Sequence, residues 1–112
     1  MPDLHLDQST LRALREIMLE GFPLLLKTYL DDSETRLLAL RQASASGEAE
    51  ALRRTAHSLK GSSSNLGAVR LVHLCQLLED LGRSGQLAAA AELVARVEEE
   101  FAVVRRLLLA HD

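Results

Sequence analysis

His57 is the residue whose type and surroundings most clearly suggest chemistry. It lies in the segment Ala56-His57-Ser58-Leu59-Lys60-Gly61. The positions that repeat on one helical face around it are Leu52, Ala56, Leu59, Ser63 and Leu66. On the same helical wheel His57 falls more than a quarter of a turn from this stripe, so we expect its imidazole to be exposed to solvent.

The expected neighbours of His57 on the helix surface are Arg53, Lys60, Gly61 and Ser64. A glycine inside a helix costs ~1 kcal/mol relative to alanine, so Gly61 needs a reason, and bare backbone beside the imidazole would admit a bulky partner. Lys60 can reach His57 on the helix surface and attract an anionic group delivered to it. A neutral imidazole is nucleophilic near pH 7, and phosphoryl transfer requires mainly positioning and charge stabilisation. These residues therefore favour a phosphoryl acceptor over a general base.

The rest of the chain predicts helices that could position this histidine. A short first helix is expected after Asp7 or Ser9 as N-cap, and four longer ones follow. The first helix carries Leu11, Leu14, Ile17 and Met18 on its apolar side, and the longer helices run from Phe22 to near Gly47, over Glu48–Leu66, over about Ala68–Arg83, and from Ala90 to beyond Leu108. Glycines separate these segments, and Gly82 with Gly85 is expected to end the fourth.

Each long helix has one apolar stripe that is expected to face inward. Outside the His57 helix, the predicted inward residues are Phe22, Leu25, Leu26, Tyr29, Ser33, Leu37 and Leu40, then Leu71, Leu74, Leu78 and Leu81, then Ala90, Val94, Val97, Phe101, Val104 and Leu108. Four such helices joined by short turns predict an all-α, antiparallel up-down four-helix bundle, with the short N-terminal helix capping one end.

Composition limits the classes of protein that the chain can belong to. Its 112 residues suffice for one domain, predicted to be residues 1–112, with a hydrophobic core. The net charge of -3 and the lack of a basic stripe argue against binding to nucleic acid. No secretory segment and no run long enough to span a membrane is present, so we expect a cytoplasmic protein that does not bind membranes. We also expect a monomer.

The segment from Ala56 to Arg83 resembles the histidine-containing phosphotransfer (Hpt) domains of multistep two-component relays. Those domains carry an Ala-His-x-Leu-Lys-Gly core, then Leu-Gly-Ala, then Leu-Cys-x-x-Leu-Glu. At the family's spacing this sequence has Ala56-His57-Ser58-Leu59-Lys60-Gly61, Leu66-Gly67-Ala68 and Leu74-Cys75-Gln76-Leu77-Leu78-Glu79. The pattern spans about a quarter of the chain, and the remainder agrees through its helices alone.

The resemblance implies roles for individual residues. His57 would carry the phosphoryl group on its outer ring nitrogen, Lys60 would assist, and Gly61 would leave space for the partner. The family often has Gln or Glu at the position of Glu79, where it could orient the other ring nitrogen. Members do not bind ATP or catalyse alone. They exchange phosphoryl groups with aspartates of receiver domains of hybrid kinases and response regulators, and the magnesium ion belongs to the receiver, so no cofactor is expected here.

Other interpretations stay open at this stage. Glu79 could be a half-exposed carboxylate paired with Arg83 at i+4. Arg53 and Ser64 are candidates for the partner-binding surface, although arginines such as Arg53 and Arg54 are more often solvated charges than docking residues. The whole chain could be a helical adaptor that binds a signalling partner without phosphate; binding that does not depend on His57 would favour this.

A metal site is not expected. His5, His73, His111 and Cys75 do not combine into a ligand pattern on one helical face, so a metalloenzyme or hydrolase is ranked last. Cys75 is predicted to be a small buried residue.

Overall fold

Helices account for nearly all of the chain that the structure describes, which is residues 5–110 of a computed structural model. The α-helices are α1 (Gln8–Met18), α2 (Phe22–Ser46), α3 (Ala49–Asn65), α4 (Val69–Ser84) and α5 (Ala90–Ala110). Two short 3-10 helices, η1 (Leu19–Gly21) and η2 (Leu87–Ala89), precede α2 and α5. The predicted boundaries of the two middle helices are correct to within one residue at each end.

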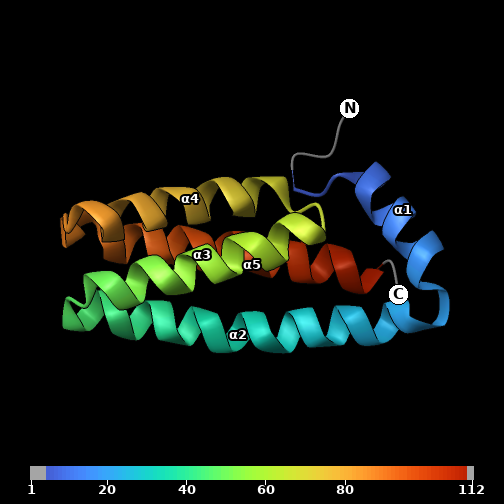
Figure 1. Ribbon diagram of the computed structural model, residues 1–112, viewed down its shortest axis with the longest axis horizontal. Coiled ribbons are helices and arrows are strands. Elements are labelled where there is room, and N and C mark those ends of the chain that lie inside the picture. Colours follow the sequence, from blue (N-terminus) through green and yellow to red (C-terminus); the bar gives the residue numbers. More distant parts are fainter. Residues whose placement is uncertain (1–4, 111–112) are drawn as a thin grey trace.

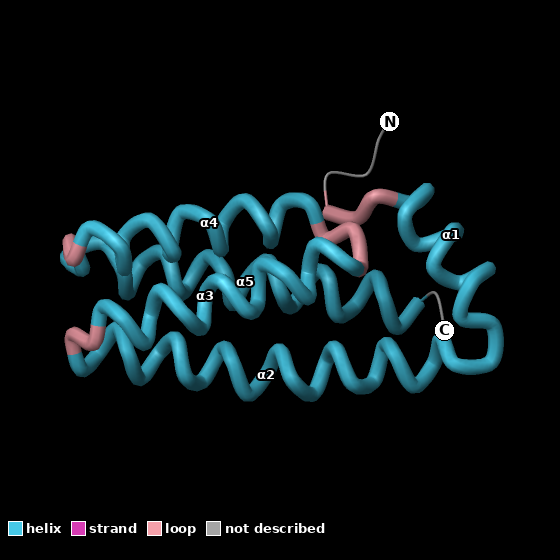
Figure 2. The backbone as a smooth tube through the Cα atoms, viewed as in Figure 1, coloured by secondary structure: helices cyan, strands magenta, loops and turns pink. Residues whose placement is uncertain are grey.

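Helices α2 to α5 form the predicted antiparallel bundle, with α3 lying between α2 and α4 (Figure 1). Short turns join successive long helices, as the tube view shows (Figure 2). Gly47, Gly67 and Gly85 occupy these turns with φ of 66°, 74° and 75°. Only glycine adopts this left-handed backbone without a steric penalty, which is why these residues stop the helices where they do. The most extensive packing is between α3 and α4.

The core is built from the stripes that the sequence predicts. On α3 the buried residues are Leu52, Ala56, Leu59 and Ser63. The predicted stripe of α5 is buried in full, and that of α2 is buried except for the half-buried Leu25. Burying Ser63 does not leave its hydroxyl unpaired, because it lies 2.8 Å from the hydroxyl of Tyr29 on α2.

Helix α1 lies across one end of the bundle, as predicted (Figure 1). Its N-cap is Asp7, whose carboxylate accepts hydrogen bonds from the backbone N–H groups of Ser9 and Thr10. The Asp7 N–H donates to the carbonyl of Gly67 at 2.8 Å, which fastens the start of α1 to the α3–α4 turn. The predicted apolar side of α1 is wrong in part: Leu11 is buried, but Ile17 and Met18 are exposed. The C-terminal end of α1 lies beyond the ends of α3, α4 and α5 (Figure 1).

The buried face of α4 differs in part from the prediction, of which Leu71 and Leu78 are confirmed. Leu74 and Leu81 are only half buried, and the buried positions are Leu71, Cys75, Leu78, Glu79 and Gly82. Gly82 does not end the helix, which continues to Ser84 and stops at Gly85. A Cβ on Gly82 would lie 2.8 Å from the carbonyl oxygen of Ala49 and from the backbone nitrogen of Arg53. This glycine therefore allows α4 to approach the first turns of α3 closely.

Candidate functional site

His57 is presented on the surface of the bundle. It lies in the middle of α3, opposite the buried stripe of that helix, and 63% of its side chain is exposed. Gly61 follows one turn later, and a Cβ built there would meet no heavy atom within 4 Å. The surface beside the imidazole is thus open on this side, and a second protein could reach the ring.

Glu79 is the closest partner of His57 that the structure records. It projects from α4 toward α3, and His57 Nδ1 lies 3.2 Å from its Oε2. The expectation of a half-exposed carboxylate is wrong, because only 4% of the Glu79 side chain is exposed. The two alternative partners of Glu79, His57 and Arg83, both contact it: Arg83 Nη2 donates to the same Oε2 at 3.0 Å.

Lys60 is held by α4. Its Nζ forms an ion pair with Glu79 Oε1 at 2.7 Å and donates to Gln76 Oε1 at 2.9 Å. Only 23% of its side chain is exposed. The ammonium group therefore neutralises the buried carboxylate in this structure, and it lies one turn from His57 without a direct contact to the ring that the structure records.

These contacts favour the ionised form of the Glu79 carboxyl group. The pKa of the Glu79 carboxyl lies below its ordinary value, first because Lys60 donates to it and further because His57 does, while burial opposes this shift. The carboxylate is therefore ionised at neutral pH and can only accept hydrogen bonds. It follows that Nδ1 of His57 carries a hydrogen and donates the hydrogen bond to Glu79 Oε2. In the neutral ring, the lone pair is then on Nε2, the nitrogen that Glu79 does not contact.

The chain was compared with known proteins. The model of the Hpt domain family matches residues 24–107. The chain belongs to the Hpt domain family. The crystal structure of histidine-containing phosphotransfer protein B (HptB) from Pseudomonas aeruginosa PAO1 superposes with a TM-score of 0.93. The two sequences are 48% identical over 96% of this chain and 93% of that chain. The comparison with curated proteins gives no match.

Family membership gives the coarse function. Hpt domains carry phosphoryl groups on a histidine in phosphorelays and interact with receiver domains of two-component systems; they are carriers and not enzymes of the usual kind. Within residues 5–110, no helix is long and apolar enough to cross a bilayer.

The two residues predicted to bind the partner of this Hpt domain lie at different distances from the imidazole along α3. Arg53 is one turn before His57, and its Nε donates to Glu50 Oε2 at 3.1 Å. Its backbone nitrogen and Cβ lie close to Gly82, at the contact between α3 and α4. Ser64 is exposed near the end of α3 and lines a shallow hollow with residues of α4 and Asp7. The structure brings neither side chain into contact with His57.

Two residues of the Hpt site were not predicted. Gln76 bridges Lys60 and Asp80, since its Nε2 donates to Asp80 Oδ1 at 2.9 Å. Asp80 also accepts from Arg83 Nη1 at 3.2 Å. The spacing of Gln76, Asp80 and Arg83 on α4 was a usable signal, because residues three and four apart lie side by side on a helix.

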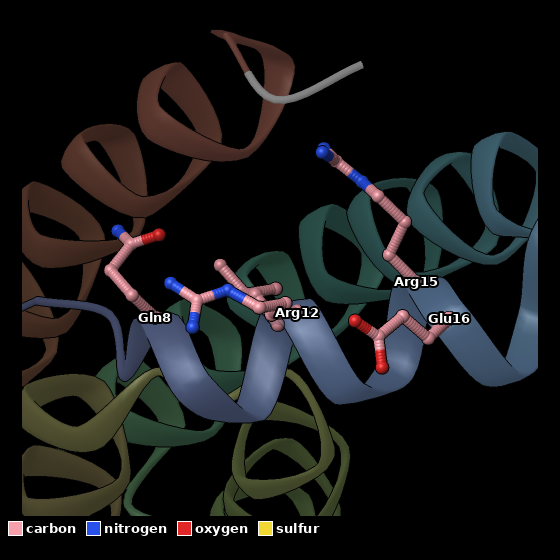
Figure 3. A pocket seen from close by; sticks show the side chains of 5 residues that line it. Gln8, Arg12, Arg15 and Glu16 are labelled. Atoms are coloured by element: carbon pink, nitrogen blue, oxygen red, sulfur yellow. The ribbon is translucent and has the colours of Figure 1, made fainter.

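Other candidate sites are separate from His57. A hollow of about 250 Å³ is lined by Gln8, Leu11, Arg12, Arg15 and Glu16 of α1, and Figure 3 shows Gln8, Arg12 and Arg15 projecting from the same side of that helix. None of these is a predicted site residue. Among residues 5–110, no group of three or more His, Cys, Asp or Glu side chains could hold a metal ion; His111 lies outside that range. Cys75 is buried as predicted, and burial raises the pKa of its thiol to about 12.

Proposed function

We propose that this Hpt protein is a phosphorelay intermediate that uses His57. It accepts a phosphoryl group from the aspartyl phosphate of one receiver domain and passes it to the aspartate of another response regulator. One observation carries the proposal: the exposed imidazole of His57 is held through Nδ1 by the buried carboxylate of Glu79. This contact points the unprotonated Nε2 to the side of the ring that a partner can reach.

The transfer step follows from this tautomer. The Nε2 lone pair attacks phosphorus, an N–P bond forms, and the bond from phosphorus to the aspartyl oxygen breaks. Its electron pair leaves with the receiver carboxylate. The imidazole ring becomes positively charged while its Nδ1 proton stays on the hydrogen bond to Glu79, whose negative charge stabilises that ring. Transfer to the next receiver is the same step in reverse.

The neighbouring residues have supporting roles in this proposal. Lys60 adds positive charge near the phosphoryl group and keeps Glu79 ionised, and Gly61 gives the receiver access to the ring. Arg53 and Ser64 would lie in or near the receiver contact. The magnesium ion that assists the exchange would come from the receiver, so the chain needs no cofactor of its own and no ATP. We expect it to act as a cytoplasmic monomer that spans residues 1–112 as one domain.

Incubation with a phosphorylated receiver domain tests the proposal. The wild-type chain is expected to become labelled with an acid-labile, alkali-stable phosphoryl group, whereas His57→Gln takes up no label. His73→Gln is the matched control, because His73 is an exposed histidine of α4 and should leave labelling unchanged. Label that persists in His57→Gln would assign the chemistry to another residue. A receiver that binds wild type and His57→Ala equally, with no label in either, would support the adaptor interpretation.

A further inference from the structure

The contacts around Glu79 form a closed network of side chains, called here the Glu79 network. Lys60 contacts Glu79 and Gln76, Gln76 donates to Asp80, Asp80 accepts from Arg83, and Arg83 returns to Glu79. His57 is attached to this network by one described contact, the hydrogen bond from its Nδ1 to Glu79. The other residues of the network therefore influence how much negative charge Glu79 offers to the imidazole.

The two oxygens of Glu79 serve different partners. Oε1 faces Lys60, and Oε2 is shared between His57 Nδ1 at 3.2 Å and Arg83 Nη2 at 3.0 Å. A cation on the same oxygen withdraws negative charge from it, which weakens the second hydrogen bond that this oxygen accepts. Asp80 holds the other end of the guanidinium group, so Arg83 stays directed at Oε2 even though 59% of its side chain is exposed.

We propose that Arg83 is a positioning residue for phosphotransfer: by sharing Oε2 of Glu79 with His57, it limits how strongly Glu79 stabilises the phosphorylated imidazole. This inference rests on the proposed function of His57. Arg83 has no described contact with the imidazole and acts through Glu79.

The direction of the effect follows from charge. The ring that attacks phosphorus is the neutral form, and the ring produced by phosphoryl transfer is positively charged at the moment that it forms. A stronger acceptor at Oε2 stabilises the charged ring more than the neutral one. Removing Arg83 therefore shifts the exchange toward phosphohistidine and slows onward transfer. The guanidinium group thus keeps the phosphoryl group easy to pass on, as a relay requires.

A lost surface cation would have the opposite effect through space, because positive charge attracts the phosphoryl group. Arg54 separates the two effects. It lies three residues before His57 on α3, 70% of its side chain is exposed, and its recorded ion pair is with Glu50 and not with Glu79. Arg54→Met thus removes a cation of the same kind from the vicinity of His57 without changing the Glu79 network.

The test measures the equilibrium and the forward and reverse rates of phosphoryl exchange with one purified receiver domain. Arg83→Met is expected to shift the equilibrium toward the phosphorylated chain by roughly threefold to tenfold, the increment of a strengthened charge-assisted hydrogen bond. Arg54→Met should leave it unchanged or shift it the other way. Arg83→Lys, which keeps a cation, should restore wild-type exchange. In a Glu79→Gln background, Arg83→Met should no longer shift the equilibrium toward the phosphorylated chain, and it should behave like Arg54→Met.

Nitrogen NMR of the unphosphorylated protein gives an independent readout. With a stronger acceptor at Oε2, the Nδ1 resonance of His57 should move downfield in Arg83→Met, and it should not move in Arg54→Met. Three outcomes would each overturn the role of Arg83: an unchanged resonance together with unchanged exchange, a shift shared with Arg54→Met, or a shift toward the phosphorylated chain that survives in Glu79→Gln. If the wild-type chain takes up no label on His57, the proposed function itself fails, and this inference fails with it.

Discussion

Glu79 is a charged residue that is buried between two helices. Its carboxylate lies in the α3–α4 interface, where an unpaired charge would be strongly destabilising. Lys60 forms an ion pair with its Oε1, and His57 and Arg83 donate to its Oε2, so partners come from both helices. Because the carboxylate is buried and paired, its orientation is restricted, and this restriction is passed on to the exposed imidazole. An exposed imidazole is thus held by a carboxylate in the interior, as the proposed function of His57 requires.

Replacing Lys60 distinguishes its two possible actions. Lys60→Met keeps the aliphatic packing of the side chain and removes the ammonium group from Glu79 Oε1. We expect slower phosphoryl transfer and a free energy of unfolding lower by about 1–3 kcal/mol, because a buried carboxylate loses its closest cation. Transfer rates with a phosphorylated receiver and urea denaturation measure the two effects.

The double variant Lys60→Met/Glu79→Gln identifies the route of the rate effect. If Lys60 acts through Glu79, the effects of the two substitutions on the transfer rate are not additive. Additive effects would mean that the ammonium group acts on the phosphoryl group directly. Transfer at the wild-type rate in Lys60→Met would contradict both actions.

At the scale of elements, two glycines within helices have different physical reasons. Gly61 on α3 has open space where a Cβ would be, whereas Gly82 on α4 lies against the backbone of Ala49 and Arg53. Gly61→Ala should raise the free energy of unfolding by ~1 kcal/mol through helix propensity alone. Gly82→Ala gains the same propensity, but it forces α3 and α4 apart, and overpacking of this kind costs roughly 1–3 kcal/mol.

The same substitution is thus expected to stabilise one helix and destabilise its neighbour, as thermal or urea unfolding of the two variants would measure. Gly82→Ala should also lengthen the His57–Glu79 contact, because these residues lie on the two helices that separate. A Gly82→Ala variant that is more stable than wild type would show that the close approach of α4 to α3 is unnecessary.

Most of the fold could be predicted from the sequence because it depends on local signals. Apolar stripes of helical period and the turn glycines Gly47, Gly67 and Gly85 locate the helices nearly to the residue. Gly82 was misjudged because a helix-ending glycine and a helix-packing glycine look alike without the neighbouring helix. The predicted buried face of α4 is rotated relative to the observed one for a related reason. A glutamate such as Glu79 is not expected in the core unless its partners on α3 are known.

The site was predictable to a similar extent. The exposure of His57 and the open space at Gly61 follow from the helical period of α3, which the sequence displays directly. The contacts of Lys60 with Glu79 and Gln76 cross between helices, so they depend on how far α4 is rotated about its axis. The sequence pattern of a single helix does not predict this rotation.

At the scale of the whole molecule, the bundle and the N-terminal helix differ in their relation to the family. The Hpt family model matches residues 24–107, which lie within α2 to α5, while the similarity to HptB covers 96% of the chain. Helix α1 is joined to the rest by the contact of Asp7 with the α3–α4 turn. The His57 site is built entirely by α3 and α4, so the four-helix bundle contains every described contact on which the proposed chemistry depends.

The Glu79 network also connects the site to the stability of the whole bundle through pH. The pKa of Glu79 in the folded chain lies below its ordinary value of 4.5, so near pH 4 the unfolded chain binds more protons than the folded one. The ionised carboxylate therefore contributes stability that is fully present well above its ordinary pKa and is lost as the pH falls through that value toward the folded pKa. Glu79→Gln cannot titrate.

Urea denaturation of wild type and Glu79→Gln between pH 7 and about pH 3 tests this connection. Whatever the difference in the free energy of unfolding at pH 7, it should change in favour of Glu79→Gln as the pH falls. Asp7 and Glu50 also have lowered pKa values, but both variants contain them, so their contributions cancel in the difference. A difference that is constant over this range would mean that Glu79 is not held ionised by its partners. The assignment of the proton to Nδ1 of His57 would then lose its physical basis.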